Sequence, residues 1–296
     1  MAVRFTALAS GSSGNVALLE ADGFGLLIDC GLRPEYLAER LTLIGRSWAS
    51  VSAVLLTHTH TDHWNRHTLA HLRRQNVPLI AHPAHHAVLS GTDDYEPLRR
   101  AGLTREYEAG RADTLGPGWT VRPVPVPHDS DPTFGFRIDG PHAAWSVGYA
   151  SDVGHPTAEL AEAFAGVDLL ALEFNHDVRM QKASGRPAML INRVLGDDGH
   201  LSNAQAATLT RAVAGTGGLQ CVVQLHLSRD CNRPELAAVA GREAIRTDAP
   251  TAALLTASQR QPTRPFELAP NPVRVVRPVR FDARRTTQPV LPGLGD

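Results

Sequence analysis

Short apolar runs and longer amphipathic stretches alternate along most of the chain. Runs rich in Val, Leu, Ile, Phe and Ala, bounded by Gly, Pro or small polar residues, predict β-strands. The predicted strands cover residues 3–9, 16–20, 24–28, 53–57, 77–81, 121–126, 134–138, 143–149, 169–174 and 221–225. Their short length is typical of buried strands rather than of helices.

Helix-like segments lie between these runs, and several begin with Pro or follow a small polar residue that can cap a helix. They cover residues 34–44, 65–74, 83–89, 157–164, 187–194, 203–213 and 234–245. Strands come first in each half of the chain and helices gather after them. This order predicts an α/β protein in which two sheets pack together and helices cover them outside.

Composition limits the classes of protein that fit this pattern. The chain has 296 residues, is 43% hydrophobic and carries a formal net charge of -1, so it can bury a large core and has no global charge that would favour nucleic acid or membrane. No apolar run approaches the roughly 18 residues of a membrane span. The N-terminal segment is too short and weakly charged for a signal peptide. We therefore expect no membrane partner.

Cysteine and lysine usage adds two further points. Cys30, Cys221 and Cys231 are widely spaced and form no CxxC pair, so we expect neither a disulfide framework nor a thiolate zinc site. A reducing cytoplasm is the expected location. Lys182 is the only lysine, and arginine carries the remaining basic charge. Arginine presents a planar fork that suits phosphates, although a general compositional bias explains its abundance equally well.

The composition changes near residue 258. Residues 258–296 are rich in Pro and contain seven arginines against three acids. This segment is typical of an extended or partly disordered tail, so we predict a folded domain over residues 1–257 and a Pro/Arg-rich C-terminal tail over 258–296. The tail either straps over the body as a solvated segment or forms a nucleic-acid-binding arm.

The stretch LLTHTHTDHW at residues 55–64 carries the strongest chemical signal. It follows a predicted buried strand, and the two-residue alternation lets His58 and His60 point the same way. Asp62 and His63 can face a second point close by. Imidazole nitrogen and carboxylate oxygen suit zinc, manganese or iron, so this one loop predicts ligands for two divalent metal ions.

One loop cannot complete two coordination spheres, so further ligands should lie at other strand ends. Three residues fit because each follows an apolar run: His128 in VPVPHDS, Asp152 in VGYASDVG and His226 in VVQLHLSRD. A carboxylate is needed to bridge two ions, and Asp152 can do so. Taken singly, each could be a capping or surface residue.

These residues, in this order, resemble the metallo-β-lactamase-fold hydrolases. The resemblance runs from Asp29 in LLIDCG through the HTHTDH loop to His226. It implies an αββα four-layer sandwich, with one metal on His58, His60 and His128, the other on Asp62, His63 and His226, and Asp152 as the bridge. Asp29 is implied to orient the loop histidines without binding metal itself.

Four further stretches resemble the YycJ (WalJ) subfamily, whose members are described as metal-dependent DNA exonucleases. They are ALASGSSGNVALLE, LEFNHDVRM, GHLSNAQAA and LHLSRDCN. The last differs from the usual pattern, which has two asparagines where this chain has Cys231 and Asn232, and the tail is not part of that pattern. Ser12, Ser13 and Asn15 in SGSSGN, together with Asn175 in LEFNHD, are candidate substrate contacts, although a plain hairpin turn also explains SGSSGN.

A two-metal site suits phosphodiester cleavage because it can generate a hydroxide and stabilise charge on the phosphate. Asp62 could orient or deprotonate the attacking water, and His200 in GHLSN is the candidate proton donor to the leaving oxygen. The alternative for His200 is a structural position before the next helix. His176 is either an acid or substrate residue or a structural hydrogen-bonding residue.

The sequence thus predicts a dinuclear metal-dependent hydrolase, most like a phosphodiesterase or DNA exonuclease, with a DNA substrate. A small-molecule hydrolase acting on a cyclic phosphodiester or thioester is the alternative within enzymes. A regulatory protein with a non-catalytic metal site is the alternative outside them. The remaining histidines are expected on the surface; they are His67, His71, His82, His85, His86, His142 and His155.

Overall fold

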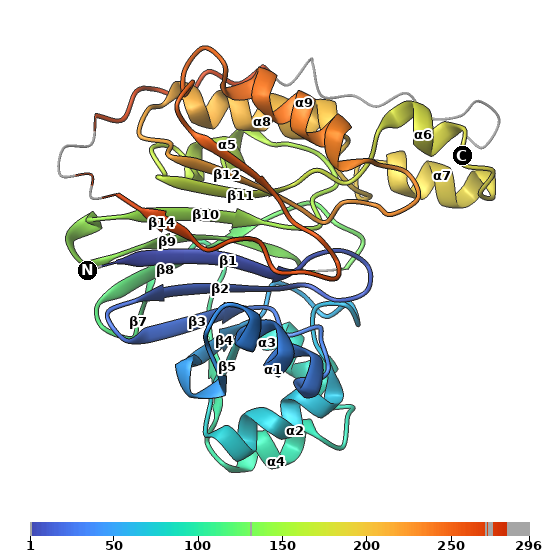
Figure 1. Ribbon diagram of the computed structural model, residues 1–296. Coiled ribbons are helices and arrows are strands. Elements are labelled where there is room, and N and C mark those ends of the chain that lie inside the picture. Colours follow the sequence, from blue (N-terminus) through green and yellow to red (C-terminus); the bar gives the residue numbers. More distant parts are fainter. Residues whose placement is uncertain (1, 131, 270, 272–274, 283–296) are drawn as a thin grey trace.

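The computed structural model describes residues 2–130, 132–269, 271 and 275–282 (Figure 1). Its strands are β1 Val3–Ala9, β2 Val16–Ala21, β3 Phe24–Ile28, β4 Ala53–Leu55, β5 Leu79–Ala81, β6 Thr104–Glu106, β7 Asp113–Leu115, β8 Trp119–Pro125, β9 Phe134–Asp139, β10 Ser146–Ala150, β11 Leu169–Glu173, β12 Cys221–Leu225, β13 Ala253–Thr256 and β14 Phe266–Leu268. Its α-helices are α1 Pro34–Leu43, α2 Arg66–Gln75, α3 Pro83–Leu89, α4 Tyr95–Arg100, α5 Ala158–Ala163, α6 Val178–Lys182, α7 Ala188–Leu195, α8 Asn203–Gly215 and α9 Pro234–Ile245. Two 3₁₀ turns cover Trp48–Ser50 and Pro141–Ala143.

Two seven-stranded sheets contain all of these strands. Their strand orders are β14-β1-β2-β3-β4-β5-β6 and β13-β12-β11-β10-β9-β8-β7. In each sheet an antiparallel meander leads into parallel strands, β3 to β6 in the first and β10 to β13 in the second. Parallel neighbours bring their carboxyl ends to one edge, so the loops that follow β4, β10, β11 and β12 can meet.

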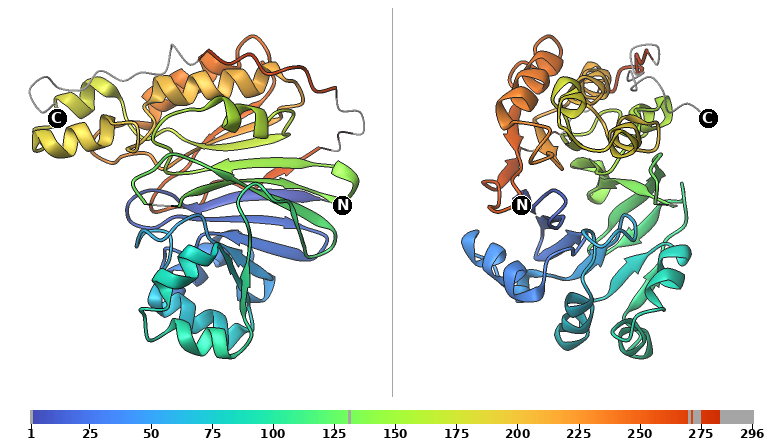
Figure 2. Two further views of the ribbon diagram at one scale, coloured as in Figure 1. Left: turned by 180° about the vertical axis from the view of Figure 1, so that it is seen from behind. Right: turned by 90° about the vertical axis from the view of Figure 1, so that its right-hand side faces the viewer.

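The molecule has four layers, as predicted (Figure 2). Aromatic and aliphatic side chains from both sheets form the central core, which includes Phe5, Phe136 and Tyr149. A second apolar cluster packs the other face of the first sheet against α1 and α2, and a third packs the second sheet against α5, α8 and α9. The αββα sandwich therefore buries both faces of each sheet. Among the described residues, no helix is long and apolar enough to cross a membrane.

All of the predicted strands and helices occur, and most of them begin or end a few residues away from the predicted position. Four short strands and two short helices were not predicted; they are β6, β7, β13, β14, α4 and α6. The exposed pattern of Thr104–Glu106 shows why, since β6 lies at a sheet edge and carries no alternating apolar signal.

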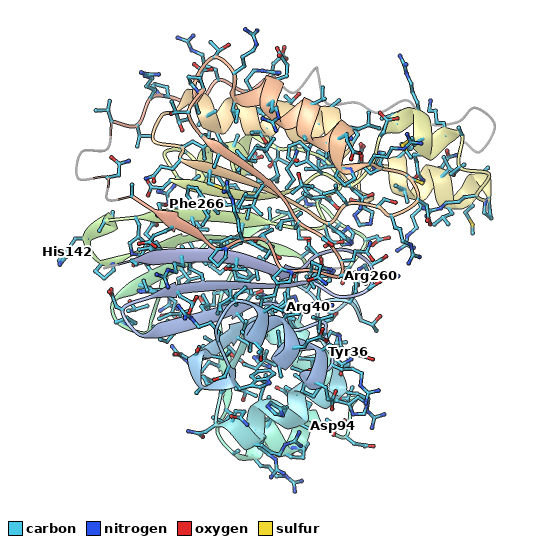
Figure 3. All side chains as sticks on the ribbon, in the orientation of Figure 1. Tyr36, Arg40, Asp94, His142, Arg260 and Phe266 are labelled. Atoms are coloured by element: carbon cyan, nitrogen blue, oxygen red, sulfur yellow. The ribbon has the colours of Figure 1, made fainter. Side chains whose placement is uncertain are left out.

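The segment predicted to be a tail begins as part of the first sheet. Phe266 of β14 pairs with Phe5 of β1 in antiparallel register. Figure 3 labels Phe266, which lies at the edge of the first sheet. The backbone N–H of Thr263 donates to the carbonyl of Ala7, 2.9 Å away. Residues 270, 272–274 and 283–296 of the predicted tail lie outside the described residues. The boundary at residue 257 stays a prediction, although β14 lies beyond it and adds an edge strand.

Two of the histidines expected on the surface are buried, so that expectation was wrong for them. His85 is 1% exposed and its Nε2 lies 2.8 Å from the carbonyl oxygen of Pro132. His86 places Nε2 2.8 Å from the carbonyl of Arg105 and Nδ1 2.8 Å from the hydroxyl of Tyr95. Helix α3 is too short to show a clear apolar face. His86 finds partners for both ring nitrogens, whereas His85 Nδ1 has none among the described residues. His142, by contrast, is exposed at the edge opposite α6 and α7 (Figure 3).

Candidate metal centre

The first group of ligand atoms comes from the loop after β4 and the loop after β8. His58, His60 and His128 each place one ring nitrogen within 4.8 Å of the others. His128 Nε2 lies 3.3 Å from His60 Nδ1. His58 and His128 are buried, whereas the His60 side chain is 35% exposed. The structure therefore brings together the three histidines that were predicted to share one metal.

Asp152 lies between this group and the second one. Its Oδ2 is 2.9 Å from His63 Nε2, and its Oδ1 is 2.9 Å from His226 Nδ1. Asp62 Oδ2 is 3.7 Å from His63 Nε2 and 3.8 Å from His226 Nε2. The predicted second set of ligands is thus also assembled. Asp152 Oδ1 also lies 3.9 Å from His128 Nε2, so this carboxylate reaches the first group as well.

The hydrogen bonds of three histidines test whether this arrangement fits a metal ion. A carbonyl oxygen can only accept, so His128 Nδ1, 3.0 Å from Gly199 O, carries the proton and leaves Nε2 with its lone pair. His63 Nδ1 lies 2.7 Å from Asp29 Oδ2, which leaves Nε2 facing Asp152. His58 Nε2 is buried without a hydrogen-bond partner in the part of the chain that the structure describes. These features are expected of histidines that bind metal through one nitrogen and donate from the other.

The pKa shifts of these histidines follow their surroundings. Burial, with His63 nearby, holds the pKa of His58 well below its usual range, and burial with His128 lowers the pKa of His60. Both rings are therefore neutral, as metal ligands must be. Burial also disfavours charge on His63, but Asp152 and Asp29 outweigh it and raise its pKa to about 10. The negative charges of Asp152 and Asp29, which stabilise this proton, would also stabilise a metal cation in its place.

Asp29 lies behind the loop, where the resemblance implied an orienting residue. Its Oδ1 accepts the backbone N–H of Thr57 at 2.8 Å, and its Oδ2 accepts from His63. The Thr57 hydroxyl lies 3.0 Å from His58 Nδ1. Asp29 is completely buried and connects to two predicted ligands through these bonds.

The local backbone places these side chains in an uncommon conformation. Asp29, Asp152 and His226 have φ values of 63°, 57° and 51°, in the left-handed region that non-glycine residues rarely adopt. Each follows a strand that ends one or two residues earlier, so a sharp turn aims its side chain at the site. Gly31 is needed for a related reason: a Cβ there would overlap the backbone carbonyl of Asp62. Strain of this kind gathers at functional sites.

Glu173 is a site residue that the sequence reasoning missed. It ends β11, is completely buried, and places Oε1 2.8 Å from His200 Nδ1 and 3.2 Å from His226 Nδ1. Burial raises its pKa, but the charge and hydrogen bonds of His200, with a hydrogen bond from His226, lower it to about 2. A charged residue at the end of the apolar run LLALE was the available signal, because buried carboxylates require partners.

The predicted catalytic residues lie in different settings. His200 is 22% exposed, and its Nδ1 is 3.6 Å from Asp152 Oδ1. Burial lowers the pKa of His200, but Glu173 outweighs it and raises it. His176 is completely buried, and its backbone carbonyl accepts from the N–H of Asn203. That burial favours the structural alternative for His176. The Asp62 side chain is 22% exposed.

The predicted substrate contacts divide in the same way. Ser12 and Ser13 are exposed, and the Ser13 hydroxyl donates to Gln259 Oε1 at 2.8 Å. Asn15 is completely buried, and its Nδ2 donates to Asp62 Oδ2 at 3.1 Å. Asn175 is buried and donates to the carbonyl of His226 at 2.9 Å. Asn15 and Asn175 therefore position predicted ligand residues, and contacts from any of the four to substrate stay predictions.

Two packed sheets with a histidine and aspartate cluster at their shared edge define the class: an αββα hydrolase fold whose site suits a divalent metal. Residues 25–221 match the family model described as "Beta-lactamase superfamily domain". The chain belongs to this superfamily, and it is a hydrolase of the metallo-β-lactamase fold.

Individual relatives agree with this assignment. Exodeoxyribonuclease WalJ of Streptococcus pneumoniae is 28% identical over 237 residues, which cover 79% of this chain and 85% of WalJ. Ribonuclease Z of Mycobacterium bovis is 30% identical over 236 residues, covering 69% of this chain and 78% of the relative. The crystal structure of the metallo-β-lactamase fold protein YhfI from Bacillus subtilis superposes with a TM-score of 0.64 at 16% identity, covering 90% of this chain and 100% of YhfI. The resemblance to the WalJ subfamily is thereby confirmed.

Proposed function

We propose that this protein is a dinuclear metal-dependent phosphodiesterase that degrades DNA from an end. The observation that carries the proposal is the position of Asp152, whose Oδ2 lies 2.9 Å from His63 Nε2 of the second predicted set and whose Oδ1 lies 3.9 Å from His128 Nε2 of the first. A carboxylate so placed can bridge two ions. The first ion would lie on His58, His60 and His128, and the second on Asp62, His63 and His226.

Two divalent ions in this position would activate water and neutralise charge on the phosphate. The chain's own residues supply the remaining steps. Asp62 is fixed by Asn15 and would orient the attacking water toward phosphorus. His200, held by Glu173 and partly exposed, would donate a proton to the leaving oxygen. The bond that breaks is the phosphorus–oxygen ester bond, and the products are a phosphate monoester and a free hydroxyl.

The similarity to WalJ supports DNA as the substrate. That relative is an exodeoxyribonuclease and aligns over most of both chains. Ribonuclease Z aligns over less of this chain, so we rank RNA behind DNA. Zinc, manganese and iron all accept this set of nitrogen and oxygen ligands, and the ligands do not choose among them.

The test is a cleavage assay on protein stripped of metal and refilled with manganese or zinc. The substrates are DNA oligonucleotides labelled separately at the 5′ and 3′ ends, with an RNA of the same sequence beside them. Asp62→Asn serves as the control because it keeps the side-chain volume and removes the carboxylate. We expect stepwise release of mononucleotides from one DNA end, absent in the control. If neither DNA nor RNA is cleaved by metal-loaded protein, the site acts on a small phosphodiester or thioester instead.

A further inference from the structure

Helices α6 and α7, with the turn between them, form an arm that extends from the body (Figures 1 and 2). We call residues 178–195 the α6–α7 arm. It contains three arginines and the chain's only lysine, and no aspartate or glutamate. The whole chain has a net charge of -1, so this local excess of four positive charges departs from its surroundings.

Two ion pairs hold the arm against loops of the metal centre. Arg193 Nε binds the carboxylate of Asp129, whose Oδ1 lies 3.4 Å from His128 Nε2 and 3.7 Å from His60 Nε2. Arg186 Nη2 lies 2.8 Å from Asp230 Oδ2, in the loop that follows His226. The arm is therefore fixed beside the predicted ligands and ends five residues before His200.

The other two cations of the arm have no ionic partner within the residues that the structure describes. Arg179 is exposed and Lys182 is half-buried, both on α6. On α7, Met189 is 77% exposed, a large apolar side chain of adaptable shape. Helices α6 and α7 contact each other, so the arm presents unpaired cations on one helix and an exposed methionine on its neighbour. This combination favours binding of a charged partner with apolar groups over an ordinary solvated face, where both signs of charge are mixed.

We propose that the α6–α7 arm binds the phosphate backbone of the DNA strand whose end enters the metal centre. Arg179 and Lys182 contact phosphates, and Met189 packs against a base or sugar. The overall charge of the chain does not steer DNA, so a local basic surface is required to hold a strand between cleavage steps. This inference rests on the proposed function for the identity of the strand, and it adds where that strand is held.

The test compares the double variant Arg179→Glu/Lys182→Glu with a matched control, Arg211→Glu/Arg242→Glu. The control residues are exposed on α8 and α9 and have no ion pair within the described ranges, so both variants change the net charge equally. Binding of dye-labelled 20-nucleotide single-stranded DNA is measured by fluorescence anisotropy in chelator, at several salt concentrations. Hydrolysis of bis(p-nitrophenyl) phosphate by the metal-loaded proteins is measured separately.

The arm variant should weaken DNA binding roughly tenfold or more and lower the slope of log Kd against log salt by about 1.4, as expected for two lost phosphate contacts. The control should bind within about twofold of wild type, and both variants should hydrolyse the small diester normally, because it is too short to reach the arm. Equal DNA binding by the arm variant, or equal losses in both variants, would overturn the proposal. If wild type hydrolyses no phosphodiester but the arm variant still loses DNA binding, the proposed function fails and the arm assignment stands.

Discussion

Glu173 and His200 form a hydrogen-bonded pair, with 2.8 Å between Oε1 and Nδ1, at the edge of the metal centre. The second oxygen of Glu173 accepts the backbone N–H groups of Val153 at 2.9 Å and Leu201 at 3.1 Å. One buried carboxylate therefore fixes the ring of His200 and the two loops that carry Asp152 and His200. Because Nδ1 of His200 faces Glu173, Nε2 lies on the side of the ring away from that carboxylate.

Glu173→Gln should lower turnover by about 10²-fold while metal content stays near wild type. The two backbone N–H groups hold the amide oxygen on their side, so the amide NH₂ faces His200 Nδ1. Nδ1 can then only accept, and the protonated ring that Glu173 stabilises is no longer favoured. A factor of that size is typical for loss of a general acid. Turnover on DNA and metal per chain by elemental analysis measure the two effects. Loss of metal in proportion to turnover would show instead that Glu173 maintains the ligands.

Asp29→Asn should weaken metal binding roughly 10- to 100-fold, as is typical when a partner of a ligand histidine is removed. The asparagine oxygen can still accept from Thr57, but its NH₂ would face His63 Nδ1 and favour the proton on Nε2, the atom that faces Asp152. Competition with a coloured chelator measures the affinity. Unchanged affinity in a variant that unfolds like wild type would contradict an orienting role for Asp29.

Protonation of buried His85 should contribute to the loss of folding stability at acidic pH. Burial, only partly offset by the hydrogen bond to Pro132, lowers its pKa to about 4 from the ordinary value of 6.5. Because the folded-state pKa is depressed, this contribution to stability is complete above pH 6.5 and is lost as the pH falls toward 4. At pH 5 the loss for this one group is about 2 kcal/mol.

The comparison is urea unfolding of wild type and His85→Gln at pH 7.5 and pH 5, both in chelator. Glutamine keeps a donor for the Pro132 carbonyl and does not titrate. The effects of all other titrating groups on stability are the same in both proteins, so they cancel in the comparison. Wild type should lose about 2 kcal/mol more than the variant between these two pH values. The same loss in both proteins would mean that His85 does not remain neutral in the fold.

Much of the architecture could be predicted from local pattern. Between Val3 and Ile28, apolar strands alternate with turns of small residues. The short connections favour antiparallel pairing of neighbouring strands as a meander. The HTHTDH loop could be recognised because its ligands are close in sequence. His128, Asp152 and His226 could be added since each directly follows an apolar strand.

The remaining features depend on contacts between distant parts of the chain. Glu173 has its role only because His200, 27 residues later, folds back onto the end of β11. Asn15 is a polar residue between two predicted strands, where the sequence pattern predicts an exposed side chain. In the structure it is buried against Asp62, 47 residues away. Strand β14 has only three residues and forms because β1 offers it a free edge. Local periodicity carries no signal of such partners.

Truncation tests whether the domain ends at residue 257. A chain that stops at Ala257 loses β14, including Leu268, which is 4% exposed. Burial of one leucine is worth about 2 kcal/mol, which corresponds to a Tm lower by roughly 4 °C or more in a chain of this size. A chain that stops at Ala269 retains the strand and should melt above the chain that stops at Ala257. Equal Tm values for the two truncations would support the boundary at 257.

The most direct test of the account is a stepwise metal titration of stripped protein, with the rate of DNA hydrolysis measured at each addition of manganese or zinc. Two ions bridged by Asp152 predict no activity without metal and a rate that reaches its plateau at two equivalents per chain. Asp62→Asn should take up metal and stay inactive. A plateau at one equivalent, or full activity in the stripped protein, would contradict the dinuclear site.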